Sequence, residues 1–562
     1  MADSISGTKA VDVVVIGAGM AGLYMLHRLR GLELSAVVFE IGRDVGGTWY
    51  WNRYPGARVD IESQEYSFSF SEELEREWRW TERYASQPEL LAYLKHVADR
   101  FDLRRRIRFE TRVTALRWNE EEQRWSVSTD RGDKLDARFV VAATGCLSVP
   151  IDPNFPGQET FKGPTYHTGR WPHQGVDFTG KRVAVIGTGS SAIQSIPQIA
   201  RQARQVVVFQ RTPNYSVPAK NRPLDPAVRE NWLAKRQENR QLQRMSWGGF
   251  LSSNPGTELA TLAREDERQR AFEERWAQGG FAVAATYADL SSDLRANAMI
   301  AEFAADKIRE IVKDPDIADR LVPKDYPFGT KRLCVDTGYY EIFNEPNVRL
   351  VDLRKTPLER ITPDGIRTSA ETFEFDAIVY AIGFDAMTGA LSRIDITGRD
   401  GLTLKRAWEA GPRAYLGLMV AGFPNLLTIT GPGSPSVLSN MVVSIEQHVD
   451  WISDLLAYMA RLGMETIEPT LDAQNAWVDH VNEKASKTLY HLANSWYLGA
   501  NVPGKPRVFM PYVGGVGPYR EFCTAVANND YVGFKLRRSR ELQCRMDQKT
   551  QASAAVDTKT AA

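Results

Sequence analysis

The chain contains two similar segments, each a run rich in Val and Ile that ends in a glycine-containing loop, and this repeat constrains the fold more than any other feature. The segments read VDVVVIGAGMAG at 11–22 and RVAVIGTGSSA at 182–192. A buried strand, a glycine turn and a helix N-terminus in this order present backbone N–H groups to a pyrophosphate. The repeat therefore predicts an α/β chain with two Rossmann-like dinucleotide-binding domains.

The two loops differ in the residue that ends the next strand. After the first loop, the strand at 37–40 ends in Glu40, whose carboxylate can accept hydrogen bonds from a ribose 2′-OH. After the second loop, the strand is followed by Arg211 and Thr212, and a cation there favours a 2′-phosphate. We therefore expect FAD at the first loop and NADPH at the second, while a solvated surface role for Arg211 is the simpler alternative. The loop residues expected to contact the two dinucleotides are Gly17, Gly19, Gly22, Gly187, Thr188, Gly189, Ser190 and Ser191.

The order of strand-like and helix-like segments predicts that the two domains are nested. From 226 to about 320, charged residues alternate with Trp, Phe, Leu and Ala, which predicts a helical insertion. Strand patterns are found at 107–118, 125–129, 137–145, 347–351 and 375–384, and 503–513 is turn-rich and then strand-like. The predicted division is an FAD-binding domain at 1–148 and 385–545, an NADPH-binding domain at 149–220 and 330–384, a helical insertion at 221–329 and a disordered tail at 546–562.

Composition narrows the class of partner. Lys plus Arg and Asp plus Glu both number 70, so the formal net charge is zero and nothing favours nucleic acid or an anionic membrane. The N-terminus lacks a secretory signal pattern, and no apolar window is long enough to span a membrane. We expect a soluble cytoplasmic enzyme with a small-molecule substrate and no obligate protein partner.

The cysteines argue against two further functions. The four of them, Cys146, Cys334, Cys523 and Cys544, are far apart and form neither a CxxC pair nor a metal-type cluster, so we expect no metal. Two redox dinucleotides in one chain imply that hydride passes from nicotinamide to flavin. A disulfide reductase would need paired cysteines near the flavin, so the electrons are expected to reach another acceptor.

Two further stretches carry a resemblance to a known family. The segment FKGPTYHTGRWP at 161–172 is similar to the Baeyer–Villiger monooxygenase fingerprint F-x-G-x-x-x-H-x-x-x-W-P/D. GGTWYWNRYPGARVD at 46–60 is similar to a second stretch of that family, G-G-x-W-x-x-x-x-Y-P-G-x-x-x-D. The resemblance runs from about 11 to 534 and is closest to the phenylacetone and steroid monooxygenases, whereas cyclohexanone monooxygenase is shorter at 434–438. The fingerprint positions that match are Phe161, Gly163, His167, Trp171 and Pro172.

The resemblance implies a reaction and a pair of catalytic residues. In this family FAD is reduced by NADPH and reacts with O2 to a C4a-peroxyflavin, which attacks a ketone and gives an ester or lactone. Arg332 matches the active-site arginine, and Asp60 is expected to hold it in place. A guanidinium effectively never deprotonates, so it can stabilise both the peroxide anion and the oxyanion of the adduct. The simpler alternative for Arg332 and Asp60 is a plain surface ion pair.

The resemblance also assigns the remaining site residues. Lys331 joins Arg211 and Thr212 at the 2′-phosphate, and Trp496 closes over the nicotinamide cofactor unless it is a core aromatic. His167 is expected to be a hinge residue or a hydrogen-bonded structural histidine, not a base. The expected flavin contacts also include Gly47, Thr48, Trp49, Asp60, Arg332 and Met441, and the expected ketone pocket includes Cys146, Ser436, Val437 and Leu438.

Alternatives remain for the pocket and for the function. The stretch at 434–438 is expected to form a wall that admits aryl-alkyl, bulky or cyclic ketones, and a solvent-facing turn is the alternative. A flavin monooxygenase that oxidises sulfides or amines is the nearest rival, although the Trp171-Pro172 ending and Arg332 argue against it. A non-catalytic redox-sensing flavoprotein is the rival from another class.

Overall fold

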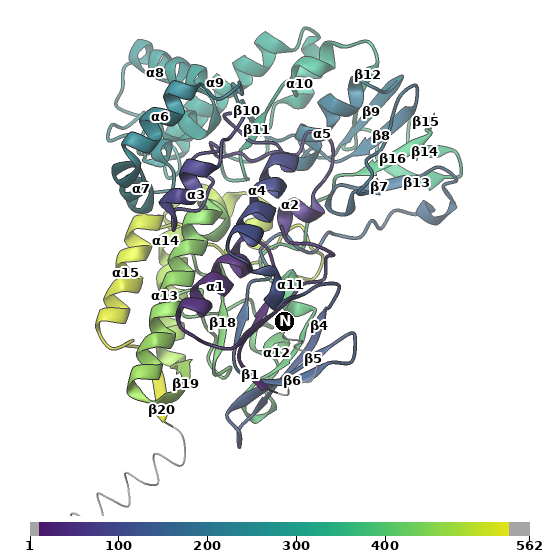
Figure 1. Ribbon diagram of the computed structural model, residues 1–562. Helices are drawn as coiled ribbons and strands as arrows, with labels where there is room; N and C mark the ends of the chain where they lie inside the picture. Colours follow the sequence, from purple (N-terminus) through teal and green to yellow (C-terminus); the bar gives the residue numbers. More distant parts are fainter. Residues whose placement is uncertain (1–9, 539–562) are drawn as a thin grey trace, which may run out of the picture.

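The computed structural model describes residues 10–538 and contains two mainly parallel sheets, each with helices packed beside it (Figure 1). The larger sheet has the order β17-β4-β5-β6-β1-β2-β3, and β18 pairs in parallel with β6. Helix α1 (Met20–Gly31) packs against β1 and β2, and α13 (Met441–Leu462) lies beside α1. Its strands are β1 (Ala10–Ile16), β2 (Ala36–Phe39), β3 (Ile107–Arg108), β4 (Val113–Asn119), β5 (Arg124–Thr129), β6 (Lys134–Ala142), β17 (Asp395–Thr397) and β18 (Leu426–Thr428).

The second sheet is entirely parallel and has the order β12-β9-β8-β16-β7. Helix α5 (Ser190–Ala200) follows its central strand β8. The strands are β7 (Thr165–His167), β8 (Arg182–Ile186), β9 (Gln205–Gln210), β12 (Val348–Asp352) and β16 (Ala377–Tyr380). Smaller sheets pair β10 (Ser216–Pro218) with β11 (Cys334–Asp336), β13 (Leu358–Thr362) with β14 (Gly365–Thr368) and β15 (Thr372–Glu374), and β19 (Met464–Pro469) with β20 (Phe534–Arg538).

The chain segments that share each sheet show how the two units are nested. The larger sheet joins strands from 10–142 with strands from 395–428, and the second sheet joins strands from 165–210 with strands from 348–380. This arrangement defines an α/β protein with two Rossmann-like units, as the paired glycine loops predict. The other α-helices outside 219–333 are α2 (Thr48–Trp51), α3 (Glu72–Glu77), α4 (Gln87–Arg100), α11 (Gly389–Ser392), α12 (Leu404–Ala407), α14 (Leu471–Ser486) and α15 (Val516–Asn528).

In the sequence, a group of helices separates the two halves of the second unit, and in Figure 1 it is shown in teal. Asp caps begin several of them; the Asp293 carboxylate, for example, accepts the N–H groups of Arg295 and Ala296. No strand is assigned between 219 and 333. The helices are α6 (Pro226–Ala234), α7 (Arg236–Met245), α8 (Glu265–Gln278), α9 (Leu294–Ile311) and α10 (Pro315–Leu321).

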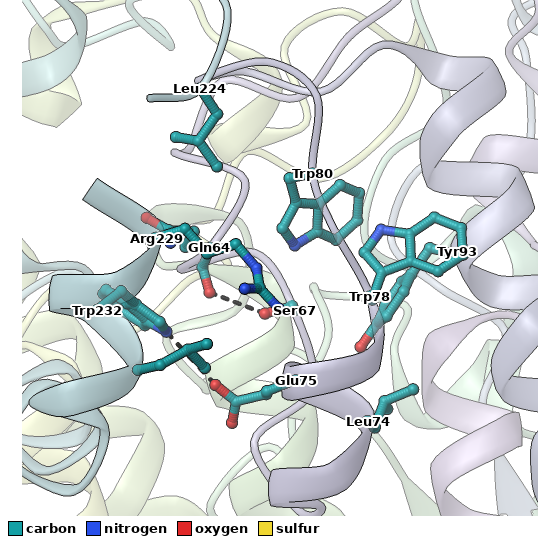
Figure 2. Close-up of a pocket in the computed structure, with 11 residues that line it drawn as sticks. Gln64, Ser67, Leu74, Glu75, Trp78, Trp80, Tyr93, Leu224, Arg229 and Trp232 are labelled. Atoms are coloured by element: carbon teal, nitrogen blue, oxygen red, sulfur yellow. Dashed lines mark hydrogen bonds between the residues drawn. The ribbon is translucent and has the colours of Figure 1, made fainter. Parts of the chain in front are cut away.

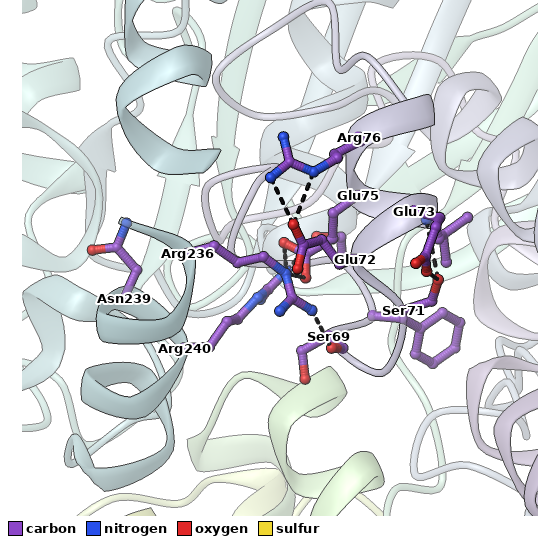
Figure 3. Close-up of polar contacts among 12 residues, drawn as sticks. Ser69, Ser71, Glu72, Glu73, Glu75, Arg76, Arg236, Asn239 and Arg240 are labelled. Atoms are coloured by element: carbon purple, nitrogen blue, oxygen red, sulfur yellow. Dashed lines mark hydrogen bonds and ion pairs between the residues drawn. The ribbon is translucent and has the colours of Figure 1, made fainter. Parts of the chain in front are cut away.

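A buried ion cluster connects this helical insertion to the first unit, the one that contains the larger sheet (Figure 3). Glu75 of α3 accepts from Arg236 Nε at 3.0 Å and from Arg240 Nη2 at 3.1 Å, and both arginines belong to α7. The side chains of Glu75 and Arg240 are 4% exposed, so water screens this pair little. A cavity of about 20 Å³ adjoins the cluster and is lined by Trp78, Trp80 and other residues that are not among the expected site residues (Figure 2). That volume suffices for about one water molecule.

Three strand predictions differ from the structure. The pattern at 107–118 corresponds to two strands, β3 and β4, and the pattern at 375–384 covers only β16. The predicted strand within 503–513 is wrong, because that backbone pairs with a 3-10 turn and a loop: Met510 N–H donates to Tyr497 O, and Tyr512 N–H donates to Ser434 O. The predicted disordered tail at 546–562 lies outside the described residues. Within 10–538, no helix has the length and apolar character needed to cross a membrane.

Candidate active site and nucleotide sites

The first glycine loop leaves room only for backbone between β1 and α1. Gly17 has φ +106°, and a Cβ added there would lie 2.6 Å from Ala143 O. The Glu40 carboxylate lies beside this loop and accepts the N–H groups of Ala18 and Gly42, each at 2.7 Å. Burial raises the pKa of Glu40, and these backbone N–H groups oppose that shift. The structure thus places the predicted ribose-binding carboxylate at the loop, as the first dinucleotide site requires.

The second family stretch meets the first glycine loop. Gly47 has φ +52°, and a Cβ on it would lie 2.9 Å from Gly19 Cα. Thr48 and Trp49 follow Gly47 as the first residues of α2, so all three expected flavin contacts adjoin the loop. Met441, another expected contact, is the first residue of α13 and is partly buried.

The second glycine loop is open on the side that faces its helix N-terminus. A Cβ on Gly189 would meet no atom within 4 Å, and the N-cap of α5 receives no side-chain hydrogen bond. Uncapped N–H groups beside open space fit a pyrophosphate. Around the loop, Thr188 Oγ1 donates to Thr212 O at 2.7 Å, Ser190 Oγ lies 3.2 Å from Cys334 Sγ, and Ser191 Oγ lies 3.0 Å from Thr168 Oγ1.

Three cations gather at the end of β9, where the 2′-phosphate is expected. Burial lowers the pKa of Lys331, and the charges of Arg211 and Arg354 lower it further. Arg354 Nη2 also donates to Thr212 Oγ1 at 3.4 Å, and Arg354 forms an ion pair with Asp325. The motifs did not indicate Arg354. The available signal was its place after β12, because the carboxyl ends of adjacent parallel strands meet at one sheet edge.

The expected catalytic pair is formed. Arg332 donates to Asp60 Oδ2 from Nε at 3.0 Å and from Nη2 at 2.6 Å, and its Nη1 donates to Val437 O at 2.7 Å. The two side chains are 26% and 24% exposed, so this is a partly buried pair. Burial lowers the pKa of Arg332, but Asp60 and Tyr497 raise it above its ordinary value. Arg332 therefore stays cationic at every working pH.

Two aromatic residues near Arg332 were not indicated by the sequence motifs. The Arg332 guanidinium carbon lies 5.6 Å from the ring centroid of Phe281, which belongs to the helical insertion. Tyr497 is buried, and burial raises its pKa while Arg332 opposes the shift. Tyr497 follows Trp496 directly in the sequence, so its neighbour was the only available signal. No pattern placed Phe281 near the site.

The expected pocket residues meet in one apolar cluster. Cys146, Val437 and Tyr497 are buried in it, and Leu438, Met441 and Trp496 pack against them partly buried. Cys146 Sγ lies 3.1 Å from Ser436 Oγ, and burial raises the pKa of the Cys146 thiol. Ser436 and Val437 are 0% and 4% exposed, so the loop is not a solvent-facing turn.

The fingerprint residues lie at the edge of the second sheet. His167 Nδ1 accepts the Gly169 N–H at 3.0 Å, and its Nε2 is 3.0 Å from Ile151 O, so both ring nitrogens have partners. Burial lowers the pKa of His167, and Arg170 adds to this effect. His167 thus ties β7 to the segment leaving the first unit. Around it, Trp171 is buried, Phe161 and Pro172 are partly buried, and a Cβ on Gly163 would lie 2.8 Å from the Phe161 ring.

The fold and the two glycine loops define the class of protein first: an oxidoreductase with two dinucleotide sites. The profile of a family described as pyridine nucleotide-disulphide oxidoreductase matches residues 14–245. The three cysteines within 10–538 are free and buried.

Comparison with whole proteins is more specific. A Baeyer–Villiger monooxygenase of Pseudooceanicola batsensis is 42% identical over 94% of this chain and 97% of its own. A solved structure of oxidized steroid monooxygenase bound to NADP is 53% identical and superposes with a TM-score of 0.91 over 94% of this chain and 100% of that one. For cyclohexanone monooxygenase from Rhodococcus sp. Phi1 bound to NADP+, the identity is 42% and the TM-score 0.92, over 95% and 100% of the two chains. The chain belongs to the Baeyer–Villiger monooxygenase family, which confirms the resemblance carried by its motifs.

Proposed function

We propose that this protein uses FAD, NADPH and O2 to convert ketones to esters or lactones. The observation that carries the proposal is Arg332, which is held between Asp60 and the Val437 carbonyl and is bordered by the apolar cluster of Cys146, Leu438 and Trp496. The first glycine loop fits FAD and the second fits NADPH, since each combines a tight backbone turn with a matching charge at the end of the next strand. Family membership supports the same reaction.

The bound cofactors would supply the hydride and the oxygen-activating ring, and the protein supplies a fixed positive charge. A guanidinium carries five N–H groups, and Asp60 and Val437 engage three of them in Arg332. N–H groups directed elsewhere can face an oxygen that becomes negative when the ketone is attacked. Because the cation is already in place, little reorganisation is needed at that moment.

The apolar cluster of expected pocket residues supports ketones with bulky, aryl-alkyl or cyclic groups as substrates. The cluster around Val437 offers apolar side chains together with the Cys146 thiol and the Ser436 hydroxyl, which bond each other. Apolar walls with few polar groups select by shape. We place Trp496 over the nicotinamide end of the coenzyme, where its partly buried ring can cover the site, and we propose that the enzyme acts in the cytoplasm.

The test is ketone-dependent oxidation of NADPH together with the mass of the product. We expect an ester or lactone one oxygen atom heavier than the ketone for at least one member of a panel of linear, aryl, macrocyclic and steroidal ketones. Thioethers and tertiary amines in the same assay test the rival oxygenase. Sulfoxide or N-oxide formation without any ester would refute the proposal, and the absence of every oxygenated product would favour a non-catalytic flavoprotein.

A further inference from the structure

One face of helix α5 touches both chain segments that supply the Arg332–Asp60 pair. Ser190 and Gln194 lie four residues apart and therefore share this face. Ser190 Oγ lies 3.2 Å from Cys334 Sγ, and Cys334 follows Arg332 by two residues. On the other side, Gln194 contacts the 54–60 segment, which ends at Asp60.

Gln194 holds the 54–60 segment with both ends of its amide. Its Oε1 accepts the Tyr54 hydroxyl at 2.8 Å and the Arg58 N–H at 3.4 Å, and its Nε2 donates to Arg58 O at 3.1 Å. Gln194 is 8% exposed, so little water can replace these bonds. The segment also approaches the α5 backbone closely, because a Cβ on Gly56 would overlap the Gln194 carbonyl oxygen.

These contacts fix Asp60 with respect to the second unit. Arg58 is two residues before Asp60, and the intervening Val59 N–H donates to Ala85 O at 3.1 Å, so the backbone leading to Asp60 is held from two sides. Arg332 approaches Asp60 from the segment that enters β11, which itself packs against α5. The pair therefore spans two segments that one helix aligns.

We propose that Gln194 is a positioning residue that sets Asp60, and through it Arg332, in register with the nucleotide loop at the start of α5. The inference rests on the proposed function. A shift of the Arg58 backbone would displace the Asp60 carboxylate, and misplacement by about 1 Å of a group that orients the reacting centre can cost up to about a hundredfold in rate. Gln194 acts without touching substrate.

The test compares Gln194→Leu with Gln198→Leu in FAD-loaded enzyme. Gln198 lies one turn further along α5, and its Cγ lies 3.0 Å from where a Cβ on Gly56 would be, so it borders the same segment. Among residues 10–538 its side chain forms no hydrogen bond, which makes it a matched control for the Gln194 amide. We expect Gln194→Leu to bind 2′,5′-ADP with wild-type affinity but to lose about tenfold in kcat, with a larger share of NADPH electrons released as hydrogen peroxide. Gln198→Leu should keep wild-type values. Tyr54→Phe, which removes only the hydrogen bond from the Tyr54 hydroxyl to Gln194 Oε1, should show a smaller loss of the same kind and serves if the Leu variant does not fold.

A double-mutant cycle distinguishes positioning from a general structural role. If Gln194 acts through Asp60, then Gln194→Leu should cause little further loss of ester formation in an Asp60→Ala background. Additive losses, or equal behaviour of the Gln194→Leu and Gln198→Leu variants, would overturn the inference while the proposed function stands. Wild-type enzyme that forms no ester or lactone would overturn both.

Discussion

Replacing Arg354 by Ala should reduce the preference for NADPH, because this cation completes the cluster at the expected 2′-phosphate site. Arg354 lies 3.4 Å from Thr212 Oγ1 and depresses the pKa of Lys331 together with Arg211, after the effect of burial. A charge-assisted hydrogen bond to phosphate is worth about 1.5–3 kcal/mol when shielded from water. Arg354 is 43% exposed and must exchange its Asp325 partner for the phosphate. We therefore expect Arg354→Ala to lose about 0.7–1.4 kcal/mol of this interaction, or about three- to tenfold in kcat/KM for NADPH.

The assay measures kcat/KM for NADPH and for NADH, together with calorimetric affinity for 2′,5′-ADP at low and high salt. Arg354→Ala should lower kcat/KM for NADPH and the affinity for 2′,5′-ADP, and should leave kcat/KM for NADH unchanged. The loss of affinity should be smaller at high salt. Asp325→Asn should act in the opposite direction, because it releases Arg354 from its ion pair. Arg349→Ala is the matched control, since Arg349 lies on the same strand β12 and pairs with Glu371.

Equal losses for the two coenzymes after Arg354→Ala would refute the assignment of this residue. An Arg211→Ala variant that narrows the NADPH preference while Arg354→Ala does not would confine the 2′-phosphate site to Arg211, Thr212 and Lys331. Equal use of NADPH and NADH by the wild type would refute the whole site.

Three further expectations follow from single contacts. Arg332→Ala should still bind FAD but lose on the order of a hundredfold or more in ester formation, and wild-type rates in that variant would contradict the role of Arg332. Burial and the charge of Arg520 lower the pKa of His448 to about 3, below its ordinary value. The unfolded chain therefore binds a proton at this histidine at a higher pH than the folded chain does, so the free energy of unfolding should decrease as the pH falls from about 6.5 toward 3. Thermal melting should show this decline, and His448→Asn, which keeps an acceptor for the Thr430 N–H, should flatten it; an unchanged pH profile would contradict the assignment. Leu438→Ala should raise kcat/KM for bulky ketones relative to cyclohexanone, and an unchanged ratio across the panel would contradict a pocket role.

The parts of the fold that could be predicted are those that local backbone geometry dictates. Gly17 and Gly187 have φ values of +106° and +118° and lie against backbone carbonyls, so no other residue type would fit these loops easily. Each loop joins a buried strand to a helix, which is why the sequence pattern identified both units. The helical insertion was equally visible, because no strand pattern interrupts it.

The parts that could not be predicted depend on segments brought together in space. Phe281 and Gln194 reach the site from an inserted helix group and the face of α5, and neither position has a spacing signal in the chain. Arg354 has only its place after β12 as a signal, and that becomes informative once the neighbouring strand is known. The strand expected within 503–513 fails for a related reason. Its backbone groups find partners at Ser434 and Tyr497, and these partners cannot be identified from the segment itself.

The loop at 434–438 shows how pocket shape and catalysis are linked in this chain. Its sequence suggests a pocket wall, and shortening it would be the obvious way to test that role. The structure shows that the Val437 carbonyl receives Arg332 Nη1 at 2.7 Å, so a deletion would also release the guanidinium. Side-chain truncation at Leu438 keeps that carbonyl and changes only the apolar wall, which makes it the interpretable perturbation. The pocket wall and the support of Arg332 share one backbone segment. Changes in loop length should therefore alter both the preferred size of the ketone and the rate of ester formation, whereas changes in a side chain should alter the preferred size alone.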